Sequence, residues 1–424
     1  MRSRGIATFF FNRTGRAEAV NSTFFARNFI AMGKFPAIVL HRHKAEAVKR
    51  FHPWIFSGAI KRADKGLQNG DVVEVFAEDG TYLATGHFSN GSIAVRIFSF
   101  EQTDDLNALW VKKFKAAYEV RRTAGLTDAK DTNVYRLVFG EGDGMPGLII
   151  DFYNGTAVIQ AHSLGMYKQR QQFAEALKPV YGNALQAVYD KSSNTLHGEE
   201  SATDGYLYGS AATNQVSEHG HLFKVDWVLG QKTGFFVDQR ENRSLLAHYS
   251  TNRKVLNTFC YSGGFSVYAL KAGATLVHSV DSSAKAIDWT NENVQLNFGG
   301  EAKHQSFTQD IFDFLKASTE TYEVIVLDPP AFAKNMGARH NAIKAYSRLN
   351  AAALKRIAKG GILFTFSCSQ AVNREMFEGA VASAAIEAGR TIRVLHYLTQ
   401  PADHPVSIFH PEGLYLKGLV LHVE

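Results

Sequence analysis

The strongest constraint on the fold is the alternation of strands and helices in the C-terminal half. From about Val228, β-rich runs are separated by helical stretches, and five of these runs are long enough to be core strands: Lys254–Cys260, Thr275–Val280, His304–Thr308, Tyr322–Leu327 and Gly361–Phe366. This alternation is typical of a parallel sheet with helices on both faces. Ligands of such sheets bind at the carboxyl ends of the strands, so the residues that follow each strand are the first candidates for chemistry.

Residues after the first three strands suit a nucleoside-containing ligand. The first strand runs into a Gly263-Gly264 turn, where a ligand can approach the backbone closely. The second ends at Asp281, whose carboxylate can accept hydrogen bonds from both hydroxyls of a ribose. Asp310 follows the third and can accept a hydrogen bond from an adenine amino group. Because the turn is not G-x-G-x-x-G, we expect S-adenosylmethionine as the cofactor, not a dinucleotide.

The ordinary role of an isolated Asp after a strand is to cap the next helix. Several such residues in the right order favour one shared crevice instead. The polar segment Lys232–Asn242, which carries two aromatic residues before the first strand, is predicted to close over the donor. The predicted cofactor-binding residues are Phe235, Asp238, Gln239, Arg240, Asn257, Phe259, Tyr261, Ser262, Gly263, Gly264, Asp281, Ser283, Asp310 and Asp328.

The fourth and fifth strands end in the residues that we predict to be catalytic. Asp328 begins a rigid Asp-Pro-Pro turn that can grip the edge of a planar base. Cys368 follows the fifth strand between two serines, and the two strands should be neighbours, which places Cys368 opposite Asp328. A thiolate can add to C6 of a pyrimidine and thereby activate C5. Cys260, inside the first strand, is predicted to be a buried structural residue.

The positive charge is informative only where it is local. The net charge is +6, but residues 1–34 hold six basic residues against Glu18, which leaves about +1 for the rest. In contrast, residues 329–374 contain eight Lys or Arg and no acidic residue. Three of these lie on one face of a predicted helix, Asn341–Ile357, and are predicted to bind RNA phosphates: Lys344, Arg348 and Lys355.

Short strands separated by turn signals predict a small β barrel at residues 37–103. Its first part, His41–Lys65, holds seven Lys or Arg with interleaved aromatics, so that cations can contact phosphates while rings stack on bases. The predicted RNA-binding residues here are Arg42, Lys44, Lys49, Arg50 and Trp54. A solvated basic face around buried aromatics is an equally good interpretation.

The remaining segments complete a multidomain α/β organisation. We predict a disordered extension at 1–36, with an organellar transit peptide as the weaker alternative, a linker helix and middle α+β domain at 104–227, and the domain with the parallel sheet at 228–424. The two cysteines have no disulfide or zinc-site spacing, so no metal is expected. No apolar run approaches the roughly 20 residues that cross a bilayer, so a cytoplasmic protein is expected.

Several motifs in order carry a resemblance to a known family. They are His52–Gly58, Gly142–Gly147, Lys232–Asn242, Asp328–Pro330, Phe366–Ser369, Ala402–Pro405 and Pro411–Gly418. From about residue 37 to its end, the chain resembles the bacterial ribosomal RNA large subunit methyltransferase I group, which makes 5-methylcytosine in 23S rRNA. The resemblance implies an N-terminal PUA domain, a middle α+β domain and a C-terminal Rossmann-like methyltransferase domain. Ala331 stands where many other RNA 5-methylcytosine enzymes place a second cysteine.

Two other functions are compatible with these residues. Methylation of a guanine nitrogen needs Asp328-Pro329-Pro330 but not Cys368. A PUA-led RNA-binding or ribosome-assembly factor with a vestigial catalytic domain needs neither, although the intact Gly263, Gly264, Asp281 and Asp310 argue against it. The sequence does not decide the target nucleotide, or whether the chain acts alone or as a homodimer.

Overall fold

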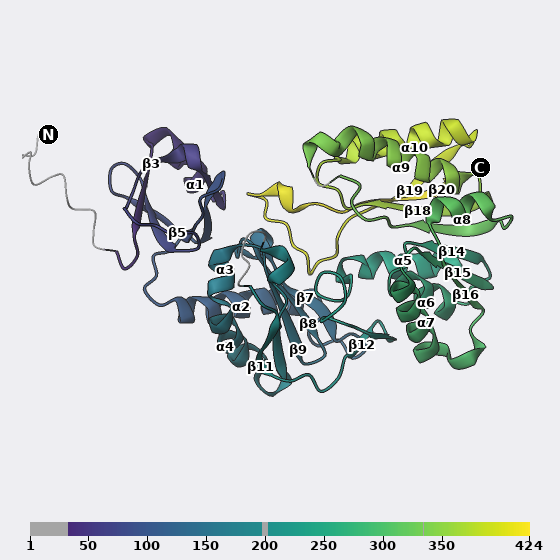
Figure 1. Ribbon diagram of the computed structural model, residues 1–424, viewed down its shortest axis with the longest axis horizontal. Coiled ribbons are helices and arrows are strands. Elements are labelled where there is room, and N and C mark those ends of the chain that lie inside the picture. The colour runs from purple at the N-terminus through teal and green to yellow at the C-terminus, as the bar shows by residue number, and fades with distance from the viewer. Residues whose placement is uncertain (1–32, 197–201, 334) are drawn as a thin grey trace, which may run out of the picture.

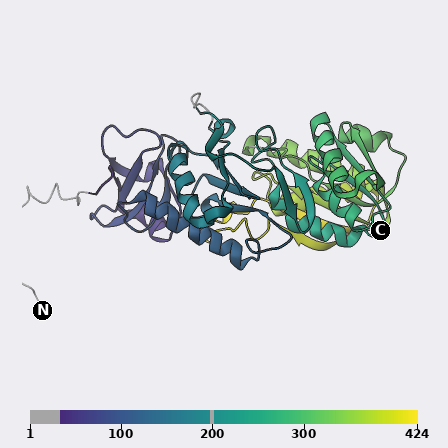
Figure 2. The ribbon, with the colours of Figure 1, turned by 90° about the horizontal axis from the view of Figure 1, so that it is seen from below.

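The computed structural model describes residues 33–196, 202–333 and 335–424. Most of the predicted extension, residues 1–32, lies outside this part. Figures 1 and 2 both show three units in a row, with the N-terminal sheet at one end and the C-terminal sheet at the other. In the part of the chain that the structure describes, no helix is long and apolar enough to cross a membrane.

The N-terminal unit is a six-stranded sheet in the order β2-β6-β5-β4-β1-β3. Alternating Val and Ile side chains fill its core, among them Val73, Val75, Val95 and Ile97. This agrees with the predicted small β fold. Its elements are β1 (Ala37–Leu40), α1 (Ala45–Lys49), β2 (Trp54–Phe56), β3 (Ile60–Ala63), β4 (Val72–Phe76), β5 (Tyr82–Phe88) and β6 (Ile93–Ser99).

The middle unit is a five-stranded sheet in the order β11-β10-β9-β8-β7, covered by helices α2 and α4. Asp105 caps α2 by accepting a hydrogen bond from Ala108 N, and the apolar face of α2 buries Trp110 and Phe114 against Phe173 of α4. The elements are α2 (Leu106–Thr123), β7 (Val134–Phe139), β8 (Leu148–Tyr153), β9 (Thr156–Ala161), α3 (Leu164–Lys168), α4 (Arg170–Tyr181), β10 (Ala187–Asp190) and β11 (Gly205–Gly209).

A separate hairpin, β12 (Gln215–Glu218) and β13 (His221–Lys224), follows the middle sheet. The sequence placed this stretch in the middle region, but the hairpin packs on α7 of the C-terminal unit, where Asn293 and Asn297 accept hydrogen bonds from its backbone. A shared cluster of buried residues joins the hairpin, the middle sheet and the C-terminal helices.

The C-terminal unit is a seven-stranded sheet in the order β16-β15-β14-β17-β18-β20-β19. The first five strands of this order are parallel, and β20 is antiparallel to both of its neighbours. The elements are α5 (Arg240–Ser250), β14 (Lys254–Thr258), α6 (Gly264–Lys271), β15 (Leu276–Asp281), α7 (Ala284–Phe298), β16 (His304–Thr308), α8 (Ile311–Ala317), β17 (Tyr322–Leu327), α9 (Arg339–Leu354), β18 (Ile357–Ser367), α10 (Arg374–Ala388), β19 (Ile392–Leu398) and β20 (Lys417–Val423).

Helices cover both faces of this sheet, as the alternation predicts. Figure 1 shows α8, α9 and α10 on one side of the strands and α5, α6 and α7 on the other. The chain order reverses between β14 and β17, because the strands first run outward to β16 and then return to the other side of β14. Ligands of doubly wound sheets bind at such a point, so the expected ligand site is at the carboxyl ends of β14 and β17.

The connection between β19 and β20 is an extended arm, residues 399–416, which we call the C-terminal arm. Figure 1 shows it as the yellow segment that leaves the C-terminal sheet and reaches toward the N-terminal unit. Phe409 of the arm contacts Phe51, with ring centroids 5.3 Å apart, and His410 packs on Trp54 at 4.3 Å. The arm therefore touches all three units.

Buried ion pairs fix the arm to the rest of the molecule. Asp403 accepts hydrogen bonds from Arg240 Nη2 at 2.8 Å and from Arg136 N at 3.0 Å, while its backbone carbonyl accepts one from Arg121 at 2.7 Å. Arg240 also faces Glu218, which pairs with Arg243 through two bonds of 2.8 Å. Asp403, Arg240 and Glu218 are fully buried. Buried ion pairs thus connect α5 with the hairpin and the arm, and a hydrogen bond from Arg121 connects α2 with the arm.

We expect Asp403→Asn to lower the stability of the native protein by about 3–5 kcal/mol, because the buried Arg240 loses its hydrogen-bonded charge partner and keeps only Glu218, 3.7 Å away. Chemical denaturation measures this change. Glu119→Gln is the matched control: Glu119 forms an exposed pair with Arg122, and its loss should change stability by less than about 1 kcal/mol. Equal effects of the two substitutions would contradict the account.

Candidate active site

Strand pairing brings three predicted site segments to one level of the sheet. Thr258, the last residue of β14, pairs with Leu327, the last residue of β17, and Leu327 pairs with Thr365 of β18. Asp328 therefore follows directly at the sheet edge, and Cys368 lies just past the neighbouring strand. The predicted adjacency of the fourth and fifth strands is confirmed.

The loop after β14 is held in a tightly bent backbone. Phe259, Tyr261 and Gly263 have φ angles of 54°, 49° and 76°, in the left-handed region. For the two aromatic residues this conformation is strained, and such strain is common at ligand-binding loops. Asp281 stabilises the bend, because its Oδ2 accepts a hydrogen bond from Tyr261 N at 3.1 Å. The Gly-rich turn and Asp281 thus form one structural unit.

Both glycines of the turn are needed for packing within the protein. A Cβ on Gly263 would lie 2.8 Å from Thr290 of α7, and a Cβ on Gly264 would lie 3.0 Å from Arg243 of α5. From the sequence, the approach of a ligand was the reason for these glycines. The structure adds a second reason, which is the close approach of two helices.

The acidic residues after β15 and β16 also have structural partners. Asp281 Oδ1 accepts a hydrogen bond from Ser283 N, and Ser283 caps α7. Asp310 caps α8 by accepting from Phe312 N at 2.8 Å and Asp313 N at 3.3 Å. The helix-cap alternative is therefore real for Asp310. Both bonds use Oδ1, and the residue is exposed, so Oδ2 remains able to accept from a ligand.

Two of the predicted donor-site residues have interior positions instead. Phe235 is 2% exposed, packs on Phe223 and lies under the Arg243 guanidinium. Arg240 is fully buried in the ion-pair chain with Asp403. The sequence placed both near the donor because they belong to the polar segment before the first strand. Their observed contacts are those of residues that join the hairpin and the arm to α5.

Other side chains of the same segment do lie beside the catalytic candidates. Asp238 is 6% exposed and accepts a hydrogen bond from the Tyr415 hydroxyl, while Lys232 Nζ lies 3.8 Å from Asp238 Oδ2 and 4.5 Å from the centre of the Phe236 ring. Phe236 in turn packs on Tyr261 of the strained loop. Burial raises the pKa of Asp238, but Lys232 and His404 outweigh it and lower the pKa to about 2.

Asp328 has the opposite electrostatic setting. Burial raises its pKa to about 7, with the nearby charge of Asp238 adding to the effect, while Lys232 and a hydrogen bond with Gln239 act in the other direction. Two carboxyl groups at one site with pKa values far apart are a common sign of acid–base roles. Asp328 can therefore exist in both protonation states near neutral pH, whereas Asp238 stays ionised.

Cys368 is partly buried beside these groups. Burial raises its pKa, Asp328 raises it further, and Lys232 lowers it. Lys417 lies on the other side: its Nζ donates to Ser369 O at 2.7 Å, and burial lowers its own pKa to about 8. Cys260, in contrast, lies in the loop after β14 and not inside the strand as predicted, but it is buried: it is 5% exposed, has a pKa raised by burial to about 12 and lies 3.4 Å from the Thr290 hydroxyl.

Hydroxyl groups hold the backbone around Cys368. Ser367 Oγ donates to the Tyr346 hydroxyl at 2.9 Å, and Ser369 Oγ donates to Ala333 O at 2.7 Å. The first bond ties the end of β18 to α9, and the second ties it to the loop after Asp328. These bonds fix the position of Cys368 relative to Asp328.

Lys417, Tyr415 and the proximity of Lys232 to Cys368 were not predicted from the sequence. Lys417 and Tyr415 come from the start of β20 and the end of the arm, and β20 inserts beside β18 from a distant part of the chain. The pattern of apolar residues in the sequence does not predict that β20 pairs with β18. The motif Pro411–Gly418, which is part of the family resemblance, contains both Tyr415 and Lys417 and is the sequence feature that points to them.

The predicted RNA-binding residues of α9 differ in their partners. Lys344 is exposed, and Arg348 is exposed with its guanidinium 5.4 Å from the centre of the Phe312 ring. Lys355 caps the end of α9, and its Nζ lies 3.1 Å from Glu387 of α10. The helix also ends earlier than predicted, because Ile357 already belongs to β18. Two of the three cations are thus free of acidic partners among the described residues.

The predicted RNA-binding residues of the N-terminal unit also differ in exposure. Arg42, Lys44, Lys49 and Arg50 are exposed, although Lys49 pairs with Glu46 at 3.0 Å. Trp54 is half-buried: its Nε1 donates to Glu141 at 2.9 Å and its ring packs on His410. Trp54 therefore joins the three units. The exposed aromatic rings of this region are Phe51 and Phe56, each 50% exposed.

Two of the predicted cofactor-binding residues have buried polar atoms without partners among the residues that the structure describes. Asp238 Oδ1 and Asn257 Oδ1 are buried and have no hydrogen-bond partner in the described part of the chain. Buried acceptors without partners are costly and mark positions where a ligand supplies the missing donor. An ammonium group such as that of S-adenosylmethionine would satisfy a buried carboxylate oxygen beside Asp328.

Comparison with known proteins decides the family. Residues 38–100 match the family model of PUA-like domains, and residues 194–407 match that of S-adenosylmethionine-dependent methyltransferases. The ribosomal RNA large subunit methyltransferase I of Aeromonas hydrophila is 39% identical over 91% of this chain and 98% of its own length. The chain belongs to the ribosomal RNA large subunit methyltransferase I family. The member from Salmonella typhi is 36% identical over 92% of this chain and 98% of its own length.

Solved structures agree with the fold of this family. An S-adenosylmethionine-dependent methyltransferase from Streptococcus mutans aligns with a TM-score of 0.77 at 23% identity, over 91% of this chain and 99% of its own length. A further structure with the same TM-score and identity is described as a methyltransferase complexed with SAH. The cofactor of the present methyltransferase is S-adenosylmethionine, as the sequence predicts.

Proposed function

We propose that this methyltransferase forms 5-methylcytosine in the RNA of the large ribosomal subunit, through a covalent bond between Cys368 and C6 of the base. The names of its relatives support the RNA substrate. The observation that carries the chemistry is the position of Cys368 beside Asp328 at the ends of two paired strands.

Asp328 would act as the general base and acid for Cys368. Asp328 is the charged group that acts most strongly on Cys368, and its pKa of about 7 suits both the acceptance and the donation of a proton near neutral pH. In the proposed step, the Asp328 carboxylate takes the thiol proton and then gives it to N3 of the cytosine as sulfur bonds to C6. The electrons of the C5–C6 double bond then form a C4–C5 double bond, while those of the C4–N3 double bond take up the proton at N3, and the resulting enamine is nucleophilic at C5.

The remaining steps restore the enzyme. Bound S-adenosylmethionine supplies the methyl group that C5 takes up. Loss of the C5 proton to water then re-forms the C5–C6 double bond and expels the Cys368 thiolate, while N3 returns its proton to Asp328, which passes it back to Cys368. Lys232 and Lys417 stabilise the thiolate before attack and after release, because both place positive charge near the sulfur.

We expect Cys368→Ala to abolish methyl transfer to RNA while leaving the affinity for S-adenosylmethionine within about twofold, because the thiol is needed only for attack on the base. Transfer of radiolabelled methyl groups and calorimetry measure the two effects. Cys260→Ala is the matched control and should retain activity, since Cys260 is a buried residue of the loop. Full activity of the Cys368→Ala enzyme would contradict the mechanism.

Methylation of a guanine nitrogen is the second candidate, favoured by the Asp328-Pro329-Pro330 turn. This reaction needs no nucleophilic cysteine. The same Cys368→Ala enzyme would then remain active, and mass spectrometry of digested RNA would detect methylguanosine instead of 5-methylcytidine.

RNA would lie across the exposed cations of α9 and the N-terminal unit. We expect the double substitution Lys344→Ala/Arg348→Ala to weaken RNA binding and to reduce the slope of log affinity against log salt by about one for each phosphate that is no longer neutralised. Lys355→Ala is the control, because Lys355 is already paired with Glu387. Binding assays over a salt series measure the slopes. An unchanged slope in the double variant would remove α9 from the RNA interface.

A further inference from the structure

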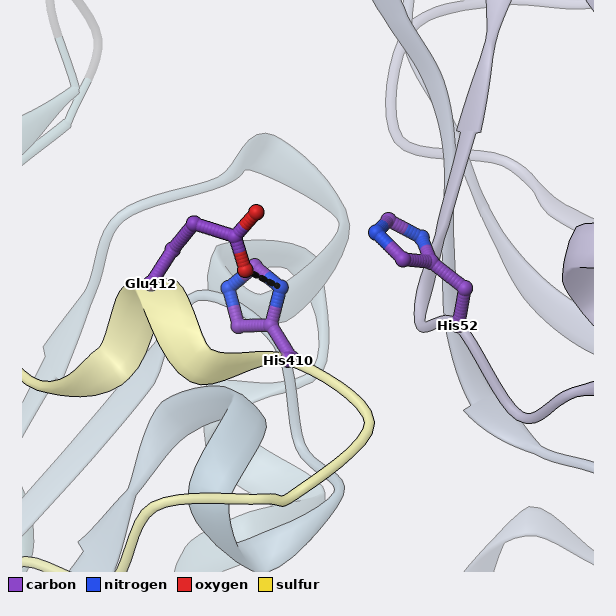
Figure 3. A group of neighbouring side chains, drawn as sticks. All are labelled: His52, His410 and Glu412. Carbon is purple, nitrogen blue, oxygen red and sulfur yellow. Dashed lines mark ion pairs between the residues drawn. The ribbon is translucent and has the colours of Figure 1, made fainter.

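Two histidines and a glutamate meet where the C-terminal arm touches the N-terminal unit. His52 precedes β2, whereas His410 and Glu412 belong to the arm, at the short 3-10 helix η10 (Pro411–Gly413). One ligand atom from each of the three lies within 4.8 Å of the others. Figure 3 shows the His52 ring pointing across the interface toward His410 and Glu412. None of these residues takes part in the proposed methyl transfer.

We propose that His52, His410 and Glu412 form a binding site for a divalent transition metal such as Zn²⁺. Two imidazole nitrogens and one carboxylate oxygen are a donor set that zinc accepts, with water as the fourth ligand of a tetrahedron. Hard cations such as Mg²⁺ prefer oxygen ligands, so the two imidazoles select against them. The single negative charge of Glu412 partly neutralises the metal.

The distances between the donor atoms favour this assignment. Ligand atoms around a tetrahedral zinc are roughly 3.4 Å apart, given bonds of about 2.0–2.1 Å. His410 Nδ1 and Glu412 Oε2 are 3.1 Å apart, so two of the three donors already have ligand spacing. Only His52 must move inward, and it is a half-buried side chain at the edge of its unit.

His410 supplies the second argument. Its side chain is 3% exposed, and Nδ1 is buried without a hydrogen-bond partner in the described part of the chain, although Glu412 Oε2 is close by. The geometry between the two atoms is therefore not that of a hydrogen bond. A buried imidazole nitrogen without a partner is unfavourable in the apo protein. A metal ion between Nδ1 and the carboxylate would satisfy both groups.

His52 has the outer contact that metal-bound histidines usually make. Its Nδ1 lies 3.1 Å from the Trp54 carbonyl oxygen, to which it donates in one tautomer, and 3.2 Å from Trp54 N, from which it accepts in the other. When Nδ1 carries the proton and donates to the carbonyl, Nε2 presents a lone pair toward the arm. The ring of Trp54 also packs on His410, so one residue orients both histidines.

Metal at this site would fix the N-terminal unit to the arm, and the arm continues to Tyr415 and Lys417 beside Cys368. The spacing of the two cysteines does not predict this site. His52 and His410 are far apart in the chain, and only the fold brings them together. The metal would thus set the position of the N-terminal unit relative to the catalytic crevice.

Calorimetric titration of Zn²⁺ into the full chain, freed of metal with a chelator and carrying no histidine tag, tests the proposal. We expect one site in the wild-type protein that is lost or at least about tenfold weaker in His52→Ala and in Glu412→Gln, since even outer-shell partners of metal sites contribute that much. Glu412 is 60% exposed, so its substitution should not disturb folding. His43→Ala, an exposed histidine of the same unit outside the cluster, is the control and should bind as the wild type does.

Two results would overturn the assignment. One is the absence of Zn²⁺ binding to the wild-type chain. The other is binding of equal affinity and stoichiometry in the wild type, His52→Ala and Glu412→Gln, which would locate the ion elsewhere. Both readouts are independent of methyl transfer, so the proposed function stands or fails separately.

Discussion

The chain of buried ion pairs around Asp403 is the interaction on which the rest of the structure depends. The buried Asp403 carboxylate is stable only while its charged partner Arg240 is present, because both groups have lost their hydration, and Arg121 binds the backbone carbonyl of the same residue. Asp403 comes from the arm, Arg240 from α5 and Arg121 from α2, so three distant segments must assemble together. The arm, once fixed at Asp403, continues to Tyr415 and Lys417 and delivers both to the active site.

The candidate site around Asp328 and Cys368 combines opposite charges at close range. Asp238 is ionised because Lys232 and His404 compensate its burial, whereas Asp328 has a pKa of about 7. This difference in pKa gives Asp328 the freedom to exchange a proton while Asp238 remains an acceptor. Lys232 contacts Asp238 and acts on both Asp328 and Cys368, so one cation connects the segment Lys232–Asn242 with Cys368.

The local pattern of apolar residues predicted the features that depend on residues close together in the chain, such as the positions of strands. The bounds of β16 and β17 match the predicted runs, and the adjacency of β17 and β18 followed from the order of a doubly wound sheet. Contacts between distant segments could not be predicted in this way. Arg240 looked like a donor-site residue because its partner Asp403 is remote in the chain, and Lys417 was missed because β20 inserts beside β18 from the C-terminus. The sequence also did not predict that α7 approaches Gly263 and α5 approaches Gly264, so the packing role of these two glycines was missed.

The central claim is that Cys368 bonds to C6 of a cytosine. RNA in which the target cytidine carries fluorine at C5 tests this most directly, because the adduct can take up the methyl group but cannot lose fluorine as it would a proton, so the thiolate is not expelled. We expect a covalent protein–RNA complex that survives denaturation and a peptide mass that locates the nucleotide and its methyl group on Cys368. Methylated RNA product without any trapped complex, or a crosslink to another residue, would contradict the account.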